Sequence, residues 1–590
     1  MAGRHSDAQV GAIESAWRVL CRTTARAFGV GFGSCLVLAL VTLGLLAGQL
    51  APLLRTARHD VLAAWSQVNP PQANTADFVP IHFSSGNPYG VNTFLYQEVE
   101  DTKIRLSLAA IKSAGFGFIR EQVAWQEFER GQKNSYWDER WQRSSWTNLD
   151  RLVRLVQEYG LQMVARVDYP PDWALPPGQT WHASPPADFA DYGDFVYTLA
   201  SRYRGQIKYY QVWNEPNLTI EWGQKPVDPA EYVRLLRVAY QRIKEADPQA
   251  VVIAAALAPT IEQGPLNLSD LDYLRQMYEA GAKDYFDIAS VNPYGLRSGP
   301  DDRSLAADDT NFSRPIQARE IMVQYGDAAK PIWASETGWC ALPPEYPLPP
   351  EYGRTTLAQQ GAYTARGYER VLREWPWLGA MFLWHFRMVD NRLASQQAYY
   401  FGILGDDFSA NPVYEDLKAA ASAPPLLYPG FRQEDNRALN YSGQWSVQGS
   451  SLAAGGALEL AASPGDRVSG RFWGSELTLV ARRGPGAGSL RVTIDGLAST
   501  TDGPLRADGG GASLDLQSRV DEWQALLPLA RGLSLGEHTF DLEVVTVGQG
   551  VAIDGFLVEA QSERSPLPLL IGLGLGLVAM FVVVRLSRRK

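Results

Sequence analysis

The chain of 590 residues is longer than one hydrophobic core usually supports, so its length predicts two or three domains. Its hydrophobic content of 46% is that of a folded protein, and its formal net charge is -10. Such a chain lacks the clustered Lys and Arg that phosphate binding requires, which argues against a nucleic-acid partner. Its three cysteines and six scattered histidines have no spacing that predicts a zinc site.

An uncharged apolar stretch occupies residues 27–54, after an arginine-containing segment at 1–26. It is long enough to cross about 30 Å of hydrocarbon, and its basic flank predicts a cytoplasmic N-terminus. A cleaved signal peptide is the alternative interpretation, because small residues follow the apolar run. In either case a linker at 55–79 leads into an exported region.

Between residues 80 and 425, short β-like runs alternate with amphipathic helical stretches. We predict strands at 90–95, 115–125, 161–170, 207–217, 250–260, 286–295, 331–340 and 379–386. We predict helices at 148–160, 188–205, 230–248, 271–285, 316–326 and 355–375. Apolar strands separated by helices indicate a parallel sheet covered on both faces, and about eight such units favour an α/β fold of the closed (β/α)8 barrel type. A doubly wound open sheet is the alternative.

After residue 425 the helical periodicity ends and short alternating strands with Gly-rich turns follow. We predict strands at 475–483, 489–496, 537–545 and 551–560, and from them a β-sandwich over residues 430–562. The sandwich is either a carbohydrate-binding module or a spacer that packs on the barrel.

The C-terminus repeats the design of the N-terminus. An apolar run at 567–584 precedes a basic tail at 585–590, which predicts a second transmembrane helix with its tail in the cytoplasm. A sorting tail is the alternative. With both basic ends inside, the barrel and the sandwich are expected on the outer face of the cell membrane.

Two predicted strands end in a glutamate. The fourth strand delivers Glu215 and the seventh delivers Glu336. In a (β/α)8 barrel the C-terminal strand ends share one mouth, so the two carboxylates can face each other across a ligand. Facing carboxylates are what glycosidic bond cleavage requires, and a separation of about 5–5.5 Å makes one of them a direct nucleophile. Taken alone, Glu215 could equally be an acid at the start of a helix.

The motifs around these glutamates resemble a known group of enzymes. "WNEPN" at 213–217 and "SETGW" at 335–339 are similar to the strand-4 and strand-7 signatures of clan A glycoside hydrolases, which are retaining enzymes on (β/α)8 barrels. The resemblance implies that Glu215 is the general acid/base and Glu336 the nucleophile. It also implies that Asn214 binds the sugar 2-hydroxyl.

Further residues match the same pattern. By the resemblance, Arg120 on strand 2 lies near the nucleophile, Tyr294 after strand 6 orients it, and Trp384 on strand 8 stacks on the sugar. Trp125 and His385 also follow strand ends, and each either contacts substrate or packs in the core. The segment after residue 430 resembles the galactose-binding-like jelly-roll sandwiches that are appended to bacterial glycosidases.

These observations predict a membrane-anchored hydrolase that cleaves O-glycosidic bonds of a polysaccharide or oligosaccharide with retention. Its partners would be a carbohydrate substrate and membrane lipid, and the barrel chemistry needs no cofactor and no metal. A non-catalytic glycan-binding surface protein on the same fold is the alternative, since a fold does not determine a function.

Overall fold

The computed structural model describes residues 61–67, 69–83, 86–389, 391–498, 505–507 and 512–560. Two compact units divide the chain, at 1–68 and 69–590. In the first unit the described residues 61–67 are helical. Both predicted transmembrane segments, 27–54 and 567–584, lie outside the described residues. Within the described ranges no helix has the length and apolar character needed to cross a membrane.

Eight parallel strands form the central sheet of the second unit. They are β1 (Tyr89–Thr93), β2 (Phe118–Ala124), β5 (Gln162–Asp168), β6 (Tyr209–Val212), β7 (Val251–Ile253), β8 (Ala289–Val291), β9 (Ile332–Thr337) and β10 (Leu378–Leu383). Parallel bridges from Ile253 to Ile288 and from Leu257 to Val291 join the two end strands, β7 and β8. The sheet is therefore closed, which confirms the barrel and excludes the open sheet.

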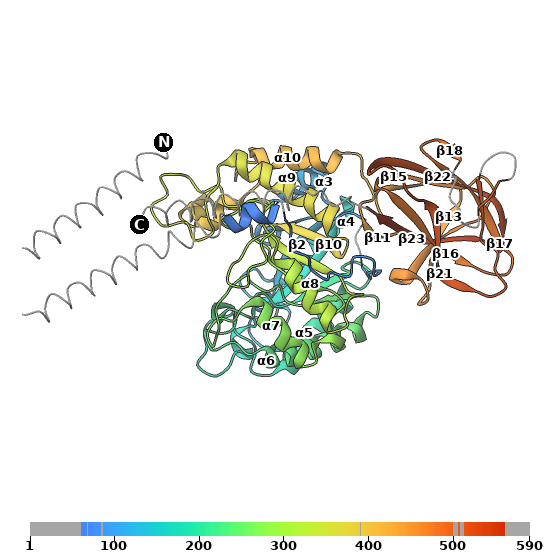
Figure 1. Ribbon diagram of the computed structural model, residues 1–590. Coiled ribbons are helices and arrows are strands. Elements are labelled where there is room, and N and C mark those ends of the chain that lie inside the picture. Colours follow the sequence, from blue (N-terminus) through green and yellow to red (C-terminus); the bar gives the residue numbers. More distant parts are fainter. Residues whose placement is uncertain are drawn as a thin grey trace, which may run out of the picture. The chain divides into compact units, whose positions relative to one another are not determined.

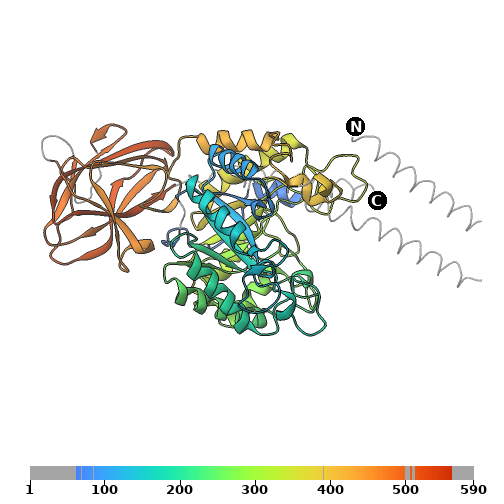
Figure 2. The ribbon, with the colours of Figure 1, turned by 180° about the vertical axis from the view of Figure 1, so that it is seen from behind.

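A helix follows each barrel strand, and the helices surround the sheet (Figures 1 and 2). They are α3 (Asp101–Ser113), α4 (Thr147–Glu158), α5 (Phe189–Arg202), α6 (Pro229–Ala246), α7 (Asp270–Glu279), α8 (Arg314–Gln324), α9 (Leu357–Glu374) and α10 (Pro412–Ser422). The helices α4 to α9 lie where the sequence predicts them. The prediction missed α3, although Ile104, Leu108 and Ile111 recur at helical spacing there and are all buried.

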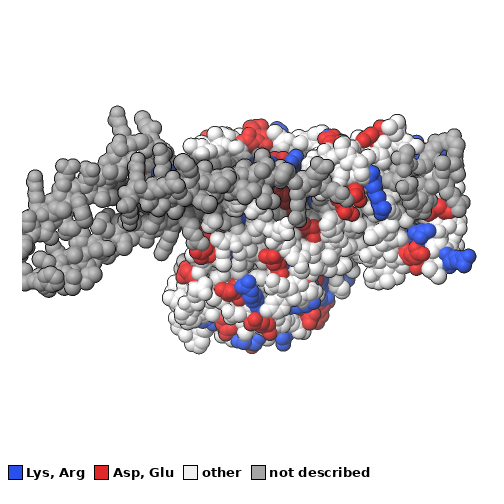
Figure 3. All heavy atoms as spheres, in the orientation of Figure 1, with Lys and Arg blue, Asp and Glu red and all other residues white. Residues whose placement is uncertain are grey.

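Charges of both signs are interspersed over the barrel surface. On the face seen in Figure 3, acidic and basic side chains alternate in small groups rather than forming a field of one sign. Several are paired along a helix, as in Arg275 with Asp272 at 2.8 Å and Arg366 with Glu369 at 2.7 Å. Exposed pairs of this kind each contribute at most about 1 kcal/mol.

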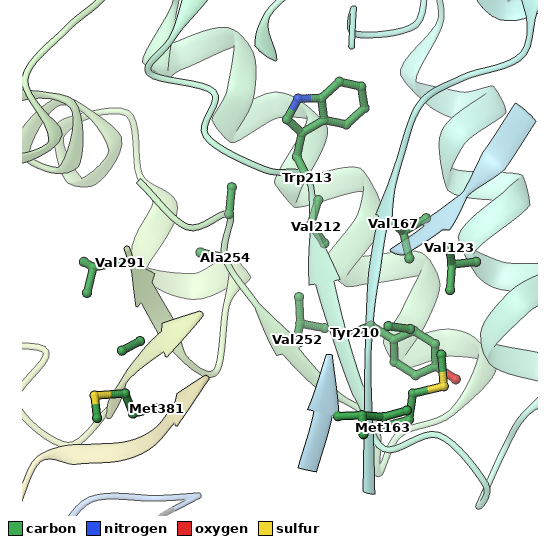
Figure 4. Packing of buried hydrophobic residues seen from close by; sticks show 14 of the residues in the cluster. Val123, Met163, Val167, Tyr210, Val212, Trp213, Val252, Ala254, Val291 and Met381 are labelled. Atoms are coloured by element: carbon green, nitrogen blue, oxygen red, sulfur yellow. The ribbon is translucent and has the colours of Figure 1, made fainter. Parts of the chain in front are cut away.

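The largest hydrophobic core lies between the strands and the helices. Val123, Val167 and Val212 are register partners on β2, β5 and β6, and each is at most 1% exposed (Figure 4). Side chains alternate between the two faces of a strand, so the neighbours of these valines point into the barrel. The barrel therefore has one core outside the sheet and a second, smaller one inside it.

The inner core begins with a layer of aromatic rings. Phe118, Tyr209 and Trp333 lie near the starts of β2, β6 and β9, with ring centroids 4.8 to 5.8 Å apart. Two residues further along β2 and β6, the same face presents Arg120 and Gln211. The interior of the barrel thus changes from apolar to polar towards the C-terminal ends of its strands.

The C-terminal region contains two antiparallel sheets, as the sequence predicts. One contains β11 (Gly430–Gln433), β13 (Trp445–Gly449), β14 (Ala457–Ala461), β16 (Glu476–Arg483), β21 (Glu522–Ala530) and β23 (Val551–Glu559). The other contains β12 (Leu439–Ser442), β15 (Arg467–Gly474), β17 (Ala487–Ile494), β18 (Leu497–Ala498), β19 (Leu505–Ala507), β20 (Ala512–Asp515) and β22 (Gly536–Gly548). Both sheets contribute to one core, for example through Leu479 and Val492.

Candidate active site

Glu215 follows β6, where the backbone leaves regular strand geometry. The amide of Glu215 donates to the carbonyl of Ala256 at 2.9 Å, so pairing with the next strand continues past the end of β6. Trp213 and Glu215 have φ values of 75° and 39°. For residues other than glycine this left-handed conformation costs about 1–2 kcal/mol each. Strain of this kind persists where the surrounding contacts hold it, and it is concentrated at functional sites.

A β-bulge brings Glu336 into the barrel. Between Ala334 and Thr337, β9 has two residues where its partner β10 has one. Such a bulge re-aims the side chains of the strand that carries it. Ser335 still faces the interior, where its Oγ lies 2.5 Å from Oγ of Ser290, and the next side chain, Glu336, faces inward as well.

Arg120 connects the two glutamate-bearing strands. Its guanidinium donates to Glu336 Oε1 at 2.8 Å and to Asn214 Oδ1 at 3.1 Å. It also donates to Gln211 Oε1 at 2.6 Å and to Asn92 Oδ1 at 2.7 Å. The residue is 2% exposed, and burial lowers the pKa of Arg120. A buried guanidinium with four acceptors fixes the position of each of them.

Two residues just after β8 each donate a hydrogen bond to one of the two glutamates. The Tyr294 hydroxyl donates to Glu336 Oε2 at 2.8 Å, and the Asn292 amide donates to Glu215 Oε1 at 2.7 Å. Because Asn292 and Tyr294 are separated by one residue, the carboxyl groups that they contact must face the same site. The structure thus brings together Glu215, Glu336, Arg120, Asn214 and Tyr294, five residues that the sequence assigns to it.

The two glutamates have different surroundings. Burial raises the pKa of Glu215 to about 8, and the charges of Glu336 and Glu221 add to the increase, while Asn292 and Arg120 oppose it. Glu336 instead accepts hydrogen bonds from Arg120 and from a tyrosine hydroxyl. Near neutral pH the raised pKa keeps Glu215 protonated, while two donors hold the carboxyl group of Glu336 in place.

A third carboxyl group, which the sequence did not indicate, belongs to the site. Glu221 ends the short helix η4 (Thr219–Glu221), and its carbonyl accepts a hydrogen bond from the indole of Trp213 at 2.8 Å. Its side chain bonds to the amide of Asn214. Burial raises the pKa of Glu221 to about 7 against the opposing charge of Arg166. Nothing in local sequence spacing reveals this residue, because only the folding back of the loop brings it to Asn214.

Arg166 was also missed. It pairs with Asp168 at 2.9 Å and lies 3.8 Å from Glu336 Oε1. Asp168 is fully buried and accepts a further hydrogen bond from Gln122 at 2.7 Å. The sequence contained a signal for this part of the site. Gln122, which bonds to Asp168, lies two residues beyond Arg120 on β2, so both side chains are on the same face of the strand.

Trp384 lies beside the site. It is partly exposed, and it packs in a small cluster with Tyr294 and Phe401. Tyr352, from the loop between β9 and α9, reaches the same cluster, with its ring 5.7 Å from that of Phe401. Aromatic side chains therefore line the side of the site on which Tyr294 contacts Glu336.

Trp125 and His385 are placed differently from this group. Trp125 is 0% exposed and stacks on Phe195 of α5 at 5.5 Å, so it belongs to the core between strands and helices. It comes five positions after Arg120, just past the end of β2, and an odd offset of this kind places the two side chains on opposite faces. His385 is also 0% exposed, its Nε2 lies 3.1 Å from the carbonyl of Ala398, and burial lowers the pKa of His385 to about 4. Neither side chain offers a surface to a ligand.

A cavity lies elsewhere in the same unit, away from the carboxylates. It has a volume of about 530 Å³, and its lining includes Tyr89 and Leu378. These residues begin β1 and β10, so this cavity lies at the opposite ends of the strands from the carboxylates. In the parts of the chain that the structure describes, no three His, Cys, Asp or Glu side chains are grouped so that they could hold a metal ion.

The tryptophans of the β-rich region are partly buried. Trp445 packs edge-on against Tyr441 at 5.0 Å, and Arg482 lies 5.0 Å above the ring of Trp523. The acids Asp495 and Asp554 already accept hydrogen bonds, from His538 or Thr539 and from a backbone amide respectively.

The structure is therefore a closed barrel with a glutamate at the ends of its fourth and seventh strands, as the sequence motifs predict. No protein-family model matches the chain, and no curated protein matches it.

Solved structures with a similar fold include a family 39 glycoside hydrolase from Bacteroides cellulosilyticus WH2. It is 19% identical, with 80% of this chain and 83% of that chain covered, and the TM-score is 0.45. The GH39 enzyme from Xanthomonas axonopodis pv. citri is 13% identical, with 80% and 96% covered and a TM-score of 0.42. Xylanase 10B from Thermotoga petrophila RKU-1 is 16% identical, with 57% and 94% covered and a TM-score of 0.38.

Proposed function

We propose that the protein is a retaining glycoside hydrolase that cleaves O-glycosidic bonds of an oligosaccharide or polysaccharide. The observation that supports this most strongly is the unequal pair of carboxyl groups. The pKa of Glu215 is raised to about 8, whereas Glu336 accepts hydrogen bonds from Arg120 and Tyr294. Cleavage with retention requires this pairing of a protonated acid with an ionised nucleophile.

The mechanism has two displacements. In the first, Glu336 attacks the anomeric carbon while Glu215 gives its proton to the leaving oxygen, so that a glycosyl ester forms and an alcohol departs. In the second, the ionised Glu215 takes a proton from water, whose oxygen attacks the same carbon and releases Glu336. Arg120 and Tyr294 hold Glu336 in place through both steps, because each donates to one of its two oxygens.

We also propose that the enzyme works on the outer face of the cell membrane, anchored in lipid by helices at 27–54 and 567–584. The support is the apolar length of each segment and the basic residues beside it, which favour a cytoplasmic location for both ends. Protease treatment of intact cells should degrade the barrel and leave the short basic ends protected.

Turnover by the full-length chain should be measured against nitrophenyl glycosides and polysaccharides, with the variants Glu336→Gln and Glu215→Gln. We expect Glu336→Gln to abolish turnover without changing the fold, since an amide oxygen is too weak a nucleophile to form the glycosyl ester. The anomeric configuration of the first product, followed by NMR, should match that of the substrate. Unchanged turnover in Glu336→Gln would reject the nucleophile, and binding without any turnover in the parent protein would favour the glycan-binding alternative.

A further inference from the structure

An exposed tryptophan lies on the loop between β5 and α5. Trp181 has an exposed fraction of 39%, so a large part of its ring surface faces solvent. Its indole nitrogen donates to the carbonyl of Ile220 at 2.6 Å, and its backbone amide donates to Gln179 Oε1 at 2.9 Å. The polar atom of the ring is thus already bonded, and what remains open to solvent is apolar ring surface.

Further hydrogen bonds join this loop to the loop that follows β6. Gln179 Nε2 donates to the carbonyl of Gly223 at 2.9 Å, and the amide of Gly223 donates to the carbonyl of Ala183 at 2.8 Å. His182, the next residue after Trp181, bonds to the carbonyl of Pro170 at 2.7 Å. The ring is therefore held in one orientation before any ligand arrives, which lowers the entropy lost on binding.

The position of Trp181 links it to the site. Its bonding partner Ile220 belongs to the short helix η4, and the next residue, Glu221, bonds to the Asn214 amide. Glu221 also lies near enough to Glu215 for its charge to act on that carboxyl group. The loops that carry Trp181 and Ile220 leave the C-terminal ends of neighbouring strands, and Ile220 is itself 54% exposed. Together the two side chains form an apolar ledge at the rim of the barrel mouth.

We propose that Trp181 is a stacking platform for a pyranose ring of the substrate other than the ring that is attacked. This inference depends on the proposed function, and it specifies the substrate as a chain of pyranoses rather than a single glycoside. A pyranose with equatorial hydroxyls presents flat faces of C–H groups, which complement an exposed indole face. Because the indole N–H is occupied by Ile220, the platform reads the shape of the ring rather than its hydroxyl pattern.

The test compares a long substrate with a short one. The full-length protein and its Trp181→Ala, Trp181→Phe and Trp523→Ala variants would be assayed on cellohexaose, xylohexaose and mannohexaose, and on the matching nitrophenyl monoglycosides. We expect Trp181→Ala to lower kcat/KM on the hexaose that the parent cleaves by about tenfold and to leave the monoglycoside unchanged. Trp181→Phe should restore most of the loss, because it retains a ring. Trp523→Ala, an equivalent truncation in the β-rich region, should have no such effect.

Binding separates this inference from the proposed function. In the Glu336→Gln background, Trp181→Ala should weaken hexaose affinity by a similar factor when measured by calorimetry. If no variant turns over any substrate but this loss of affinity remains, the platform stands and the hydrolase assignment fails. If turnover occurs and Trp181→Ala affects hexaose and monoglycoside equally, or Trp523→Ala causes the same loss, the platform is rejected. Failure of all three hexaoses to bind the parent would also overturn it.

Discussion

The raised pKa of Glu215 should be visible in the stability of the protein. The rise from an ordinary value of 4.5 to about 8 corresponds to about 5 kcal/mol at 1.36 kcal/mol per pKa unit. The Glu215 side chain is only partly shielded, so solvent weakens the effect, and we expect about 2 kcal/mol. Glu215→Gln removes the ionisation while keeping an oxygen that can accept from Asn292.

The sign follows from linkage. A group with a raised pKa in the folded state contributes its stability below its unfolded pKa and loses it as the pH rises through the folded value. The parent and Glu215→Gln should therefore have similar unfolding free energies near pH 4. By pH 9, above the folded pKa of about 8, the variant should be more stable by about 2 kcal/mol.

The measurement is urea unfolding of both proteins, followed by tryptophan fluorescence, at several pH values from 4 to 9. Glu415→Gln serves as the control, because Glu415 is an exposed acid on α10 and its replacement should give no pH-dependent difference. A difference between parent and Glu215→Gln that stays flat across this range, or that favours the parent at high pH, would refute the assignment of Glu215 as the protonated partner.

Two further outcomes concern activity. Glu221→Gln should move the basic limb of the pH profile of kcat/KM to lower pH, because the charge of Glu221 is one of the causes that raise the pKa of Glu215. An unmoved limb would contradict that coupling. Tyr294→Phe should lower kcat by about 10- to 100-fold, since a hydrogen bond to a charged group contributes about 1.5–3 kcal/mol. Circular dichroism should show an intact fold, and an unchanged kcat would exclude a role for the bond from Tyr294 to Glu336.

The fold was predictable because strand and helix periods alternate plainly in the sequence. Once a barrel is assumed, the strand-end residues Glu215 and Glu336 must share one mouth, whereas Arg120 and Tyr294 were predicted from the resemblance of their motifs to those of a known group of enzymes. This rule does not give the orientation of a side chain, because a residue near a strand end can face either the inside or the outside of the barrel. Trp125 is an example. It follows a strand end and was therefore a candidate for the site, but its offset from Arg120 assigns it to the outer face, where the structure places it.

Residues whose role depends on the path of a loop could not be predicted in this way. Glu221 reaches Asn214 only because the Trp213 indole holds the returning backbone at the Glu221 carbonyl. Trp181 likewise depends on contacts between two loops that are about forty residues apart in the chain. Such contacts leave no periodic signal, because loops have none, and single tryptophans on loops are indistinguishable in sequence from core residues.

The position of an inward-facing residue along its barrel strand determines whether it serves stability or the proposed chemistry. The ring layer of Phe118, Tyr209 and Trp333 contains no charge and closes the lower interior. Two residues further up, Arg120 is buried at a desolvation cost that is offset only because it has four acceptors. Removing one acceptor, Glu336, leaves a buried cation less well paired, so loss of the nucleophile should change both chemistry and stability. The apolar, well-packed layer beneath the site therefore supplies stability that offsets the cost of burying its charged groups.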